Sequence, residues 1–337
     1  ANKNAKRAAM VHLLFNILGT IICLILFILA DWLFSPAILG EGASYLGISI
    51  CHTAFNIACT SILLPCGGLL EKLVCKLVPD SKEPEKVAEL DERLLTTPPL
   101  ALQRCRTLTT EMATSTAETL SDSLSSLYAL TPELAAKIRK GEDTGDHYED
   151  ILGTYLVKLS ALQISEGDSA EAAMLLKAIG DFERISDHSV NLLEAAEELQ
   201  QKGLQFSDAA QKELSVLISA VEKIMTLSID AFVRNDHQAA RKIEPLEQLI
   251  DDLKEQLRTR HILRLQQGSC SIETGFIWSD LLTSLERISD HCSNIAGGII
   301  DLHEHHRNTH EALRSVRTDK RSYQATFQDY AKEFRLN

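Results

Sequence analysis

Two long apolar stretches open the chain, and apolar positions at helical spacing occupy nearly all of the rest. Residues 8–30 and 42–70 contain no Asp, Glu, Lys or Arg. As a helix with a rise of about 1.5 Å per residue, either stretch is long enough to cross the roughly 30 Å hydrocarbon core of a bilayer. The pattern therefore predicts a transmembrane helical hairpin within residues 1–78.

Basic residues flank this hairpin and indicate its orientation. Lys6 and Arg7 precede the first stretch, and Lys72 and Lys76 follow the second. Because Lys and Arg concentrate on cytoplasmic flanks, both ends of the hairpin are expected in the cytoplasm. A cleaved signal peptide fits less well, because a second apolar stretch follows almost at once. We expect a multi-pass protein of the cell inner membrane with a cytoplasmic C-terminal domain.

The remainder of the chain is expected to be helical. Prolines amid charged residues at 79–99 indicate a linker, and helical apolar spacing dominates residues 100–337. This domain divides into halves at about 100–203 and 204–310, followed by an amphipathic helix to residue 337. The predicted helices cover 100–128, 132–165, 168–202, 207–234, 236–266 and 271–306, and the last helix carries a packing stripe of Tyr323, Phe327, Tyr330 and Phe334. The expected fold class is all-α.

Composition excludes several functional classes. The net charge of −13 repels nucleic acid and suits a surface that collects cations. The eight cysteines include no Cys-x-x-Cys pair, so neither a disulfide framework nor a thiolate zinc site is indicated. We therefore expect no nucleic-acid partner.

An internal repeat supplies the candidate chemistry. Residues 183–191 recur at 286–294, an offset of 103 residues, with seven of nine positions identical. Positions i, i+4 and i+8 lie along one face of a helix, so each copy forms a ladder of oxygen ligands. The two ladders are Glu183, Asp187 and Asn191, and Glu286, Asp290 and Asn294.

A second pair of acidic ladders accompanies the first. Glu142 and Asp146 match Glu247 and Asp251 at an offset of 105 residues. Like charges four residues apart destabilise a helix, and a bound cation would compensate them. Carboxylate and amide oxygens suit Mg²⁺, Ca²⁺, Mn²⁺ and iron. Two metal sites related by approximate two-fold symmetry are therefore predicted, one in each three-helix half.

One alternative to this metal interpretation remains open, and a second fits the sequence poorly. The acids would also be satisfied by ion pairs with Arg184 and Arg287, or by solvent. A di-iron oxidase would carry Glu-x-x-His on its helices, and no His here has an acid three residues before it.

Polar residues repeat within the apolar stretches as well. His12 and Asn16 are echoed by His52 and Asn56 at an offset of 40 residues. Polar side chains at membrane depth require a partner helix or a water-filled path. Interhelical hydrogen bonding and a role in transport are both consistent with this repeat.

These motifs resemble known families. The doubled Glu-Arg-x-x-Asp-x-x-x-Asn ladder looks like the PhoU domain of phosphate-uptake regulators. Residues 7–16 and 52–56 are similar to the last part of the bacterial sodium/phosphate cotransporter family, some members of which end in a PhoU-like domain. The resemblance implies paired three-helix bundles, bound iron, zinc, magnesium or manganese, and a homodimer or a phosphate-signalling partner. It implies metal ligation by Glu183, Asp187, Glu286 and Asp290, with Asp146 and Asp251 opposite.

The expected function follows from this resemblance. Family transporters coordinate phosphate and sodium through a Gln-Ser-Ser signature, which this sequence lacks, and the chain begins with Ala just before an apolar stretch. We expect a fragment: the C-terminal part of a sodium-dependent inorganic phosphate transporter with a metal-binding regulatory domain. The alternative is a membrane-tethered adaptor or sensor that transports nothing. An enzyme is not expected, because no nucleophile, phosphate-binding glycine loop or general base is positioned for hydrolysis.

Overall fold

The computed structural model describes residues 3–34, 44–63, 67–68, 73–74, 90–304, 309–318 and 320–336. The chain divides into two compact units, Ala1–Lys86 and Val87–Asn337. The described residues form helices and no strand, as the all-α prediction requires. The predicted linker at 79–99 stays a prediction, because residues 79–89 lie outside the described residues.

The described part of the first unit contains two long apolar helices, α1 (Lys3–Phe34) and α2 (Tyr45–Leu63). They pack closely at Gly19, where an added Cβ would lie 2.9 Å from Cys59 Sγ. Within α1, Ala9–Phe34 is long and apolar enough to cross a membrane, whereas the apolar part of α2, Gly47–Leu63, is shorter. The first predicted span therefore has a matching helix. The second stays a prediction, because its final turns reach residues outside the described ranges.

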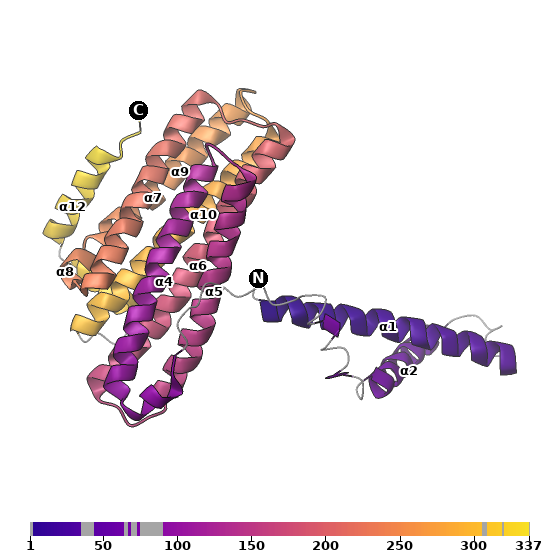
Figure 1. Ribbon diagram of the computed structural model, residues 1–337. Coiled ribbons are helices and arrows are strands. Elements are labelled where there is room, and N and C mark those ends of the chain that lie inside the picture. The colour runs from indigo at the N-terminus through magenta and orange to yellow at the C-terminus, as the bar shows by residue number, and fades with distance from the viewer. Residues whose placement is uncertain are drawn as a thin grey trace. The chain divides into compact units, whose positions relative to one another are not determined.

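Six long helices account for most of the described residues of the second unit (Figure 1). The 3₁₀ helix η3 (Glu92–Thr96) precedes them, and α8 (His237–Ala240) is a single turn. The long helices are α4 (Pro98–Ser126), α5 (Pro132–Ser160), α6 (Glu166–Lys202), α7 (Asp208–Arg234), α9 (Ile243–Gln266) and α10 (Ile272–Glu304).

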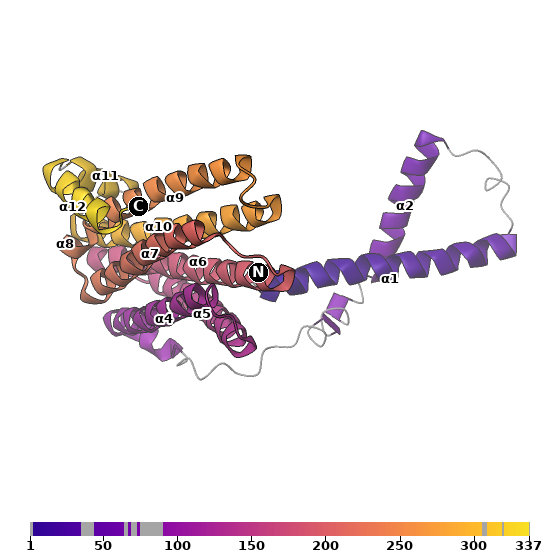
Figure 2. The same ribbon diagram turned by 90° about the horizontal axis from the view of Figure 1, so that it is seen from above.

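The six helices form two bundles of three that share a core. Helices α4, α5 and α6 pack together, as do α7, α9 and α10, while α6 against α10 and α4 against α7 join the bundles. Phe182 and Phe232 meet edge to face across this junction, with ring centroids 5.4 Å apart. Figure 2 shows the same helices obliquely from above, with α4 and α5 at one side, α9 and α10 at the other, and α6 and α7 between them. Each bundle buries apolar stripes that neither could bury alone.

One predicted helix is divided in the structure. The stretch expected as a helix at 236–266 is α8 followed by α9. Pro245 explains the division, because its ring lacks an N–H and is accommodated only in the first turn of a helix. Helix α9 accordingly begins at Ile243, two residues before this proline.

Two further helices, α11 (Thr309–Thr318) and α12 (Lys320–Glu333), close the chain. Helix α12 packs on α9 and buries Tyr330 and Phe334. Lys223 Nζ lies over both rings, 5.4 and 5.7 Å from their centroids. The aromatic stripe is thus the packing face that the sequence predicts, whereas the separate helix α11 was not expected.

Candidate metal centre

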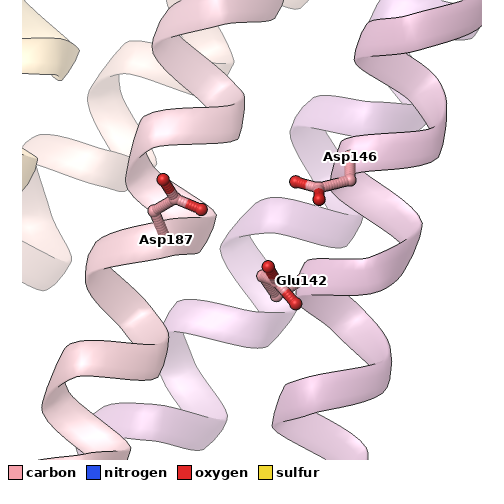
Figure 3. Close-up of side chains that lie close together, drawn as sticks. All are labelled: Glu142, Asp146 and Asp187. Atoms are coloured by element: carbon pink, nitrogen blue, oxygen red, sulfur yellow. The ribbon is translucent and has the colours of Figure 1, made fainter. Parts of the chain in front are cut away.

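Three carboxylates meet between α5 and α6, and we call them the first acidic cluster. Glu142 and Asp146 project from α5 toward Asp187 on α6 (Figure 3). One oxygen from each residue lies within 4.8 Å of the others. The i, i+4 spacing on α5 places its two acids on one face, and the facing helix supplies the third.

The second bundle repeats this arrangement. Glu247 and Asp251 of α9 and Asp290 of α10 form the second acidic cluster, again with one oxygen from each within 4.8 Å of the others. Six of the ten metal ligands predicted from the sequence therefore lie in two clusters of three, one per bundle. The duplicated spacing in the sequence is a duplicated site geometry in the fold.

Small residues let the helices of the first bundle approach each other. Gly145 faces Ser186, whose Oγ would lie 3.1 Å from an added Cβ, and Gly141 leaves no room for a Cβ beside Thr119 of α4. A larger side chain at Gly145 would push α5 away from α6. The close approach sets the separation between Asp146 and Asp187.

The clusters are costly to ionise without a cation. Burial, followed by repulsion from Glu244 and Asp251, raises the pKa of Glu247 to about 8. Burial raises the pKa of Glu183, which neighbours the first cluster, to about 7, and Asp187 adds to the effect. Burial is likewise the first cause of a raised pKa at the remaining acids Glu142, Asp146, Asp251 and Asp290. A positive ion would favour the charged forms of all these groups.

Arginines satisfy only part of this negative charge. Arg184 Nη1 lies 3.3 Å from Asp187, and Arg287 Nη1 lies 3.2 Å from Asp290. Both guanidinium groups are more than half exposed, so solvent weakens these pairs. The ion pairs considered from the sequence therefore exist, and they leave the partly buried carboxylates of each cluster facing one another.

The remaining predicted ligands lie outside the two clusters of three. Asn191 Nδ2 is 3.2 Å from His188 Nδ1, and Asn294 donates a hydrogen bond of 3.4 Å to Asp181. Glu286 Oε2 is 3.2 Å from Lys254 Nζ. Each step of four residues turns the face of a helix by about 40°, so the eighth residue of a ladder points well away from the first.

Sequence reasoning missed the groups that make the clusters unequal. Glu149 adjoins the first cluster, and at the offset of 105 residues its counterpart is Lys254, a base. Glu244 is 2% exposed beside the second cluster, where Arg317 of α11 pairs with it at 2.6 Å. The 105-residue offset, extended past the acids, would have revealed the exchange of Glu149 for Lys254.

The donor set fits a hard cation. Glu247 is 9% exposed, and its Oε2 has no hydrogen-bond partner in the part of the chain that the structure describes. A buried carboxylate oxygen without a partner is unfavourable unless a positive group satisfies it. Carboxylate-only clusters match magnesium, manganese or iron, and also bind zinc. The residues that could hold such an ion are the three acids of each cluster.

The polar residues of the first unit bond locally. Asn16 Nδ2 donates to His12 O at 2.8 Å, and Asn56 Nδ2 donates to His52 O at 2.9 Å. Both hydrogen bonds lie within a single helix and repeat the same i, i+4 geometry. An interhelical or transport role for the four residues stays a prediction.

Comparisons with known proteins agree with this architecture. The family model described as the PhoU domain matches residues 109–196 and 214–299, just over half of the chain and one match per bundle. The chain belongs to the PhoU domain family.

Two of its relatives are named for phosphate transport. "Phosphate-specific transport system accessory protein PhoU homolog 1" of Thermotoga maritima is 27% identical over 207 residues, which cover 59% of this chain and 85% of that protein. "Putative inorganic phosphate export protein YjbB" of Escherichia coli strain K12 is 23% identical over 311 residues, 89% of this chain. This chain spans 56% of the length of YjbB, and the similarity includes the first unit as well as the bundles.

Solved structures share the fold. The crystal structure of PhoU from Pseudomonas aeruginosa superimposes with a TM-score of 0.57 at 22% identity, covering 63% of this chain and 100% of that one. PhoU from Streptococcus pneumoniae gives 0.56 at 20% identity, covering 62% of this chain and 98% of that one.

Proposed function

We propose that this chain is the C-terminal part of a sodium-dependent inorganic phosphate transporter of the inner membrane, and that its PhoU domain is a cytoplasmic, metal-binding regulatory domain. The observation that carries the proposal is the pair of mirrored acidic clusters. Similarity to YjbB over 311 residues supports phosphate as the transported ion, because that relative is named for phosphate export. The resemblance of residues 7–16 and 52–56 to the sodium/phosphate cotransporter family supports sodium as the coupling ion.

In this proposal each cluster holds one or more cations through its three acids. The bound metal supplies positive charge that stabilises ionised carboxylates in a partly buried site. Because each cluster joins two helices of a bundle, occupancy also fixes the spacing of those helices. A change in that spacing is the signal that a transporter or a phosphate-signalling partner would detect, and the domain catalyses no reaction.

Metal content is the direct test. The full chain, purified in detergent, is loaded separately with iron, zinc, magnesium and manganese, dialysed, and analysed for bound metal. The double variant Asp187→Ala and Asp290→Ala is expected to lose most of the bound ion, because each substitution removes one of three ligands. Its helical circular dichroism should be unchanged.

A matched control separates ligation from net charge. Asp280 is an exposed acid on α10, and Asp280→Ala is expected to keep the wild-type metal content. Equal metal content in wild type and in the double variant would reject the metal site.

The alternative function is a membrane-tethered adaptor that regulates phosphate uptake without transporting. The absent Gln-Ser-Ser signature favours it. Reconstitution of the full-length gene product in proteoliposomes distinguishes the two functions: phosphate movement driven by a sodium gradient supports the transporter. Phosphate movement that does not respond to sodium would contradict the coupling ion, and no movement at all would favour the adaptor.

A further inference from the structure

A pocket of about 460 Å³ lies between α9 and α10, outside the acidic clusters. Lys254, Arg258 and His261 line it from α9, one helical turn after another. Phe276, Trp278 and Ser279 line it from α10. Its volume is that of a small organic ligand and is far larger than one phosphate ion requires.

A buried polar atom in the pocket wall lacks a partner. His261 is 6% exposed, and its Nε2 makes no hydrogen bond within the described residues. The imidazole stacks on Trp278, with ring centroids 5.7 Å apart. Nε2 would lie 2.9 Å from a Cβ at Gly275, so this nitrogen packs against the glycine and a larger residue there would clash with it. Burial and the charge of Arg264 lower the pKa of His261, which keeps the imidazole neutral near pH 7.

The first bundle shows that the fold does not require these groups. The register between bundles is maintained here, since Leu257 and Leu282 are buried like their counterparts Leu152 and Ile179. The counterparts of the pocket residues Lys254, Arg258, His261, Phe276, Trp278 and Ser279 are Glu149, Gly153, Leu156, Ala173, Leu175 and Leu176. The basic and aromatic groups therefore belong to the second bundle alone, and a packing role common to both halves does not explain them.

The pocket combines positive charge with an apolar wall. Arg258 is 64% exposed and lies 3.8 Å from Glu255, a weak pair that an anion can displace. Lys254 Nζ pairs with Glu286 at 3.2 Å and keeps two further hydrogen-bonding protons. Phe276 is 69% exposed at the rim, an unusual position for a phenyl ring without a partner.

We propose that this pocket binds an organic anion with an aromatic ring, of nucleotide size. Its anionic group lies on Lys254 and Arg258, and its ring packs on Phe276 at the rim of the pocket. The inference stands without the proposed metal function, because it uses none of the acids in the two clusters.

Tryptophan fluorescence provides a local test. The chain has two tryptophans, so in the variant Trp32→Phe all tryptophan fluorescence comes from Trp278. The full chain in detergent is titrated with anilinonaphthalene sulfonate, an aromatic anion, and quenching of Trp278 is followed. We expect saturable quenching in the wild type. The affinity for the probe should fall about tenfold in Arg258→Glu, because one charge-assisted contact is worth about that factor. The affinity should also fall in Phe276→Ala.

A charge control and a competition control show which feature of the probe the pocket recognises. Lys177→Glu makes the same charge change on an exposed position of the first bundle and should leave the titration unchanged. Displacement of the probe by ATP, but not by an equal concentration of inorganic phosphate, supports recognition of both ring and charge. Equal displacement by phosphate would overturn the aromatic requirement. Absent quenching, or identical quenching in Arg258→Glu and Phe276→Ala, would overturn the site.

Discussion

The acidic residues of the two clusters are held where their charges are least favourable. Glu247 is the clearest example, because burial and neighbouring carboxylates raise its pKa from 4.5 to about 8. The folded state therefore retains a proton that the unfolded state has released. Stability that depends on this proton is present at low pH and is lost as pH rises between those two values.

Metal-free protein should show this loss. In chelator-treated protein, the melting temperature of the wild type should fall relative to that of Glu247→Gln as pH rises from about 5 to about 8. Half-buried His188 and buried His261 have lowered pKa values and change stability in the opposite direction with pH. The quantity to measure is therefore the difference in melting temperature between the two proteins. A difference that is constant across this pH range would contradict the assignment. Added metal should remove this pH dependence of the melting-temperature difference.

At the scale of elements, close approach between helices decides where the acids lie. From the sequence, Gly141 reads only as a weak helix position ahead of Glu142. In the structure it is a contact point, because a Cβ there would overlap the side chain of buried Thr119 on α4.

Gly141→Ala should therefore destabilise the domain. Overpacking of a close helix contact costs about 1–3 kcal/mol, which exceeds the gain of roughly 1 kcal/mol from replacing a helical glycine. Combining it with Thr119→Ala should recover most of the loss. Gly180→Ala is the control, because nothing lies within 4 Å of its Cβ position, and it should stabilise slightly. Chemical denaturation monitored by circular dichroism measures all four proteins.

Helix α11 has a stabilising role that its sequence does not reveal. Arg317 pairs with Glu244, which is 2% exposed and also accepts a hydrogen bond of 2.6 Å from Ser293. Arg317→Ala should destabilise the protein by about 1–3 kcal/mol, because it leaves a buried carboxylate without its cation. Adding Glu244→Gln should restore part of the loss. Arg314→Ala on the same helix should have little effect, and an equal effect would contradict the role of the pair.

At the scale of the whole molecule, the first unit (Ala1–Lys86) and the second unit (Val87–Asn337) are each compact by themselves. The compact unit Val87–Asn337 contains both bundles and both acidic clusters. We predict that residues 87–337, expressed alone, fold cooperatively and bind as much metal per domain as the full chain. Thermal denaturation and elemental analysis test this. An unfolded product, or one without metal, would show that the first unit is required.

Much of this architecture is readable from the chain alone. Helical periodicity predicted the six long helices, although the structure divides the fifth into α8 and α9 just before Pro245. The offsets of 103 and 105 residues predicted two equivalent acidic faces. These are local properties, because the period of a helix fixes which residues share a face.

Only the tertiary structure decided what those faces meet. It grouped Asp187 with Glu142 and Asp146, turned Asn191 and Asn294 toward other partners, and brought Arg317 to Glu244 across 73 residues of chain. Periodicity says nothing of the rotation and separation of neighbouring helices, which depend on side chains such as Gly145 and Ser186 at the contact. Sequence determined which residues point the same way, and packing determined which of them touch.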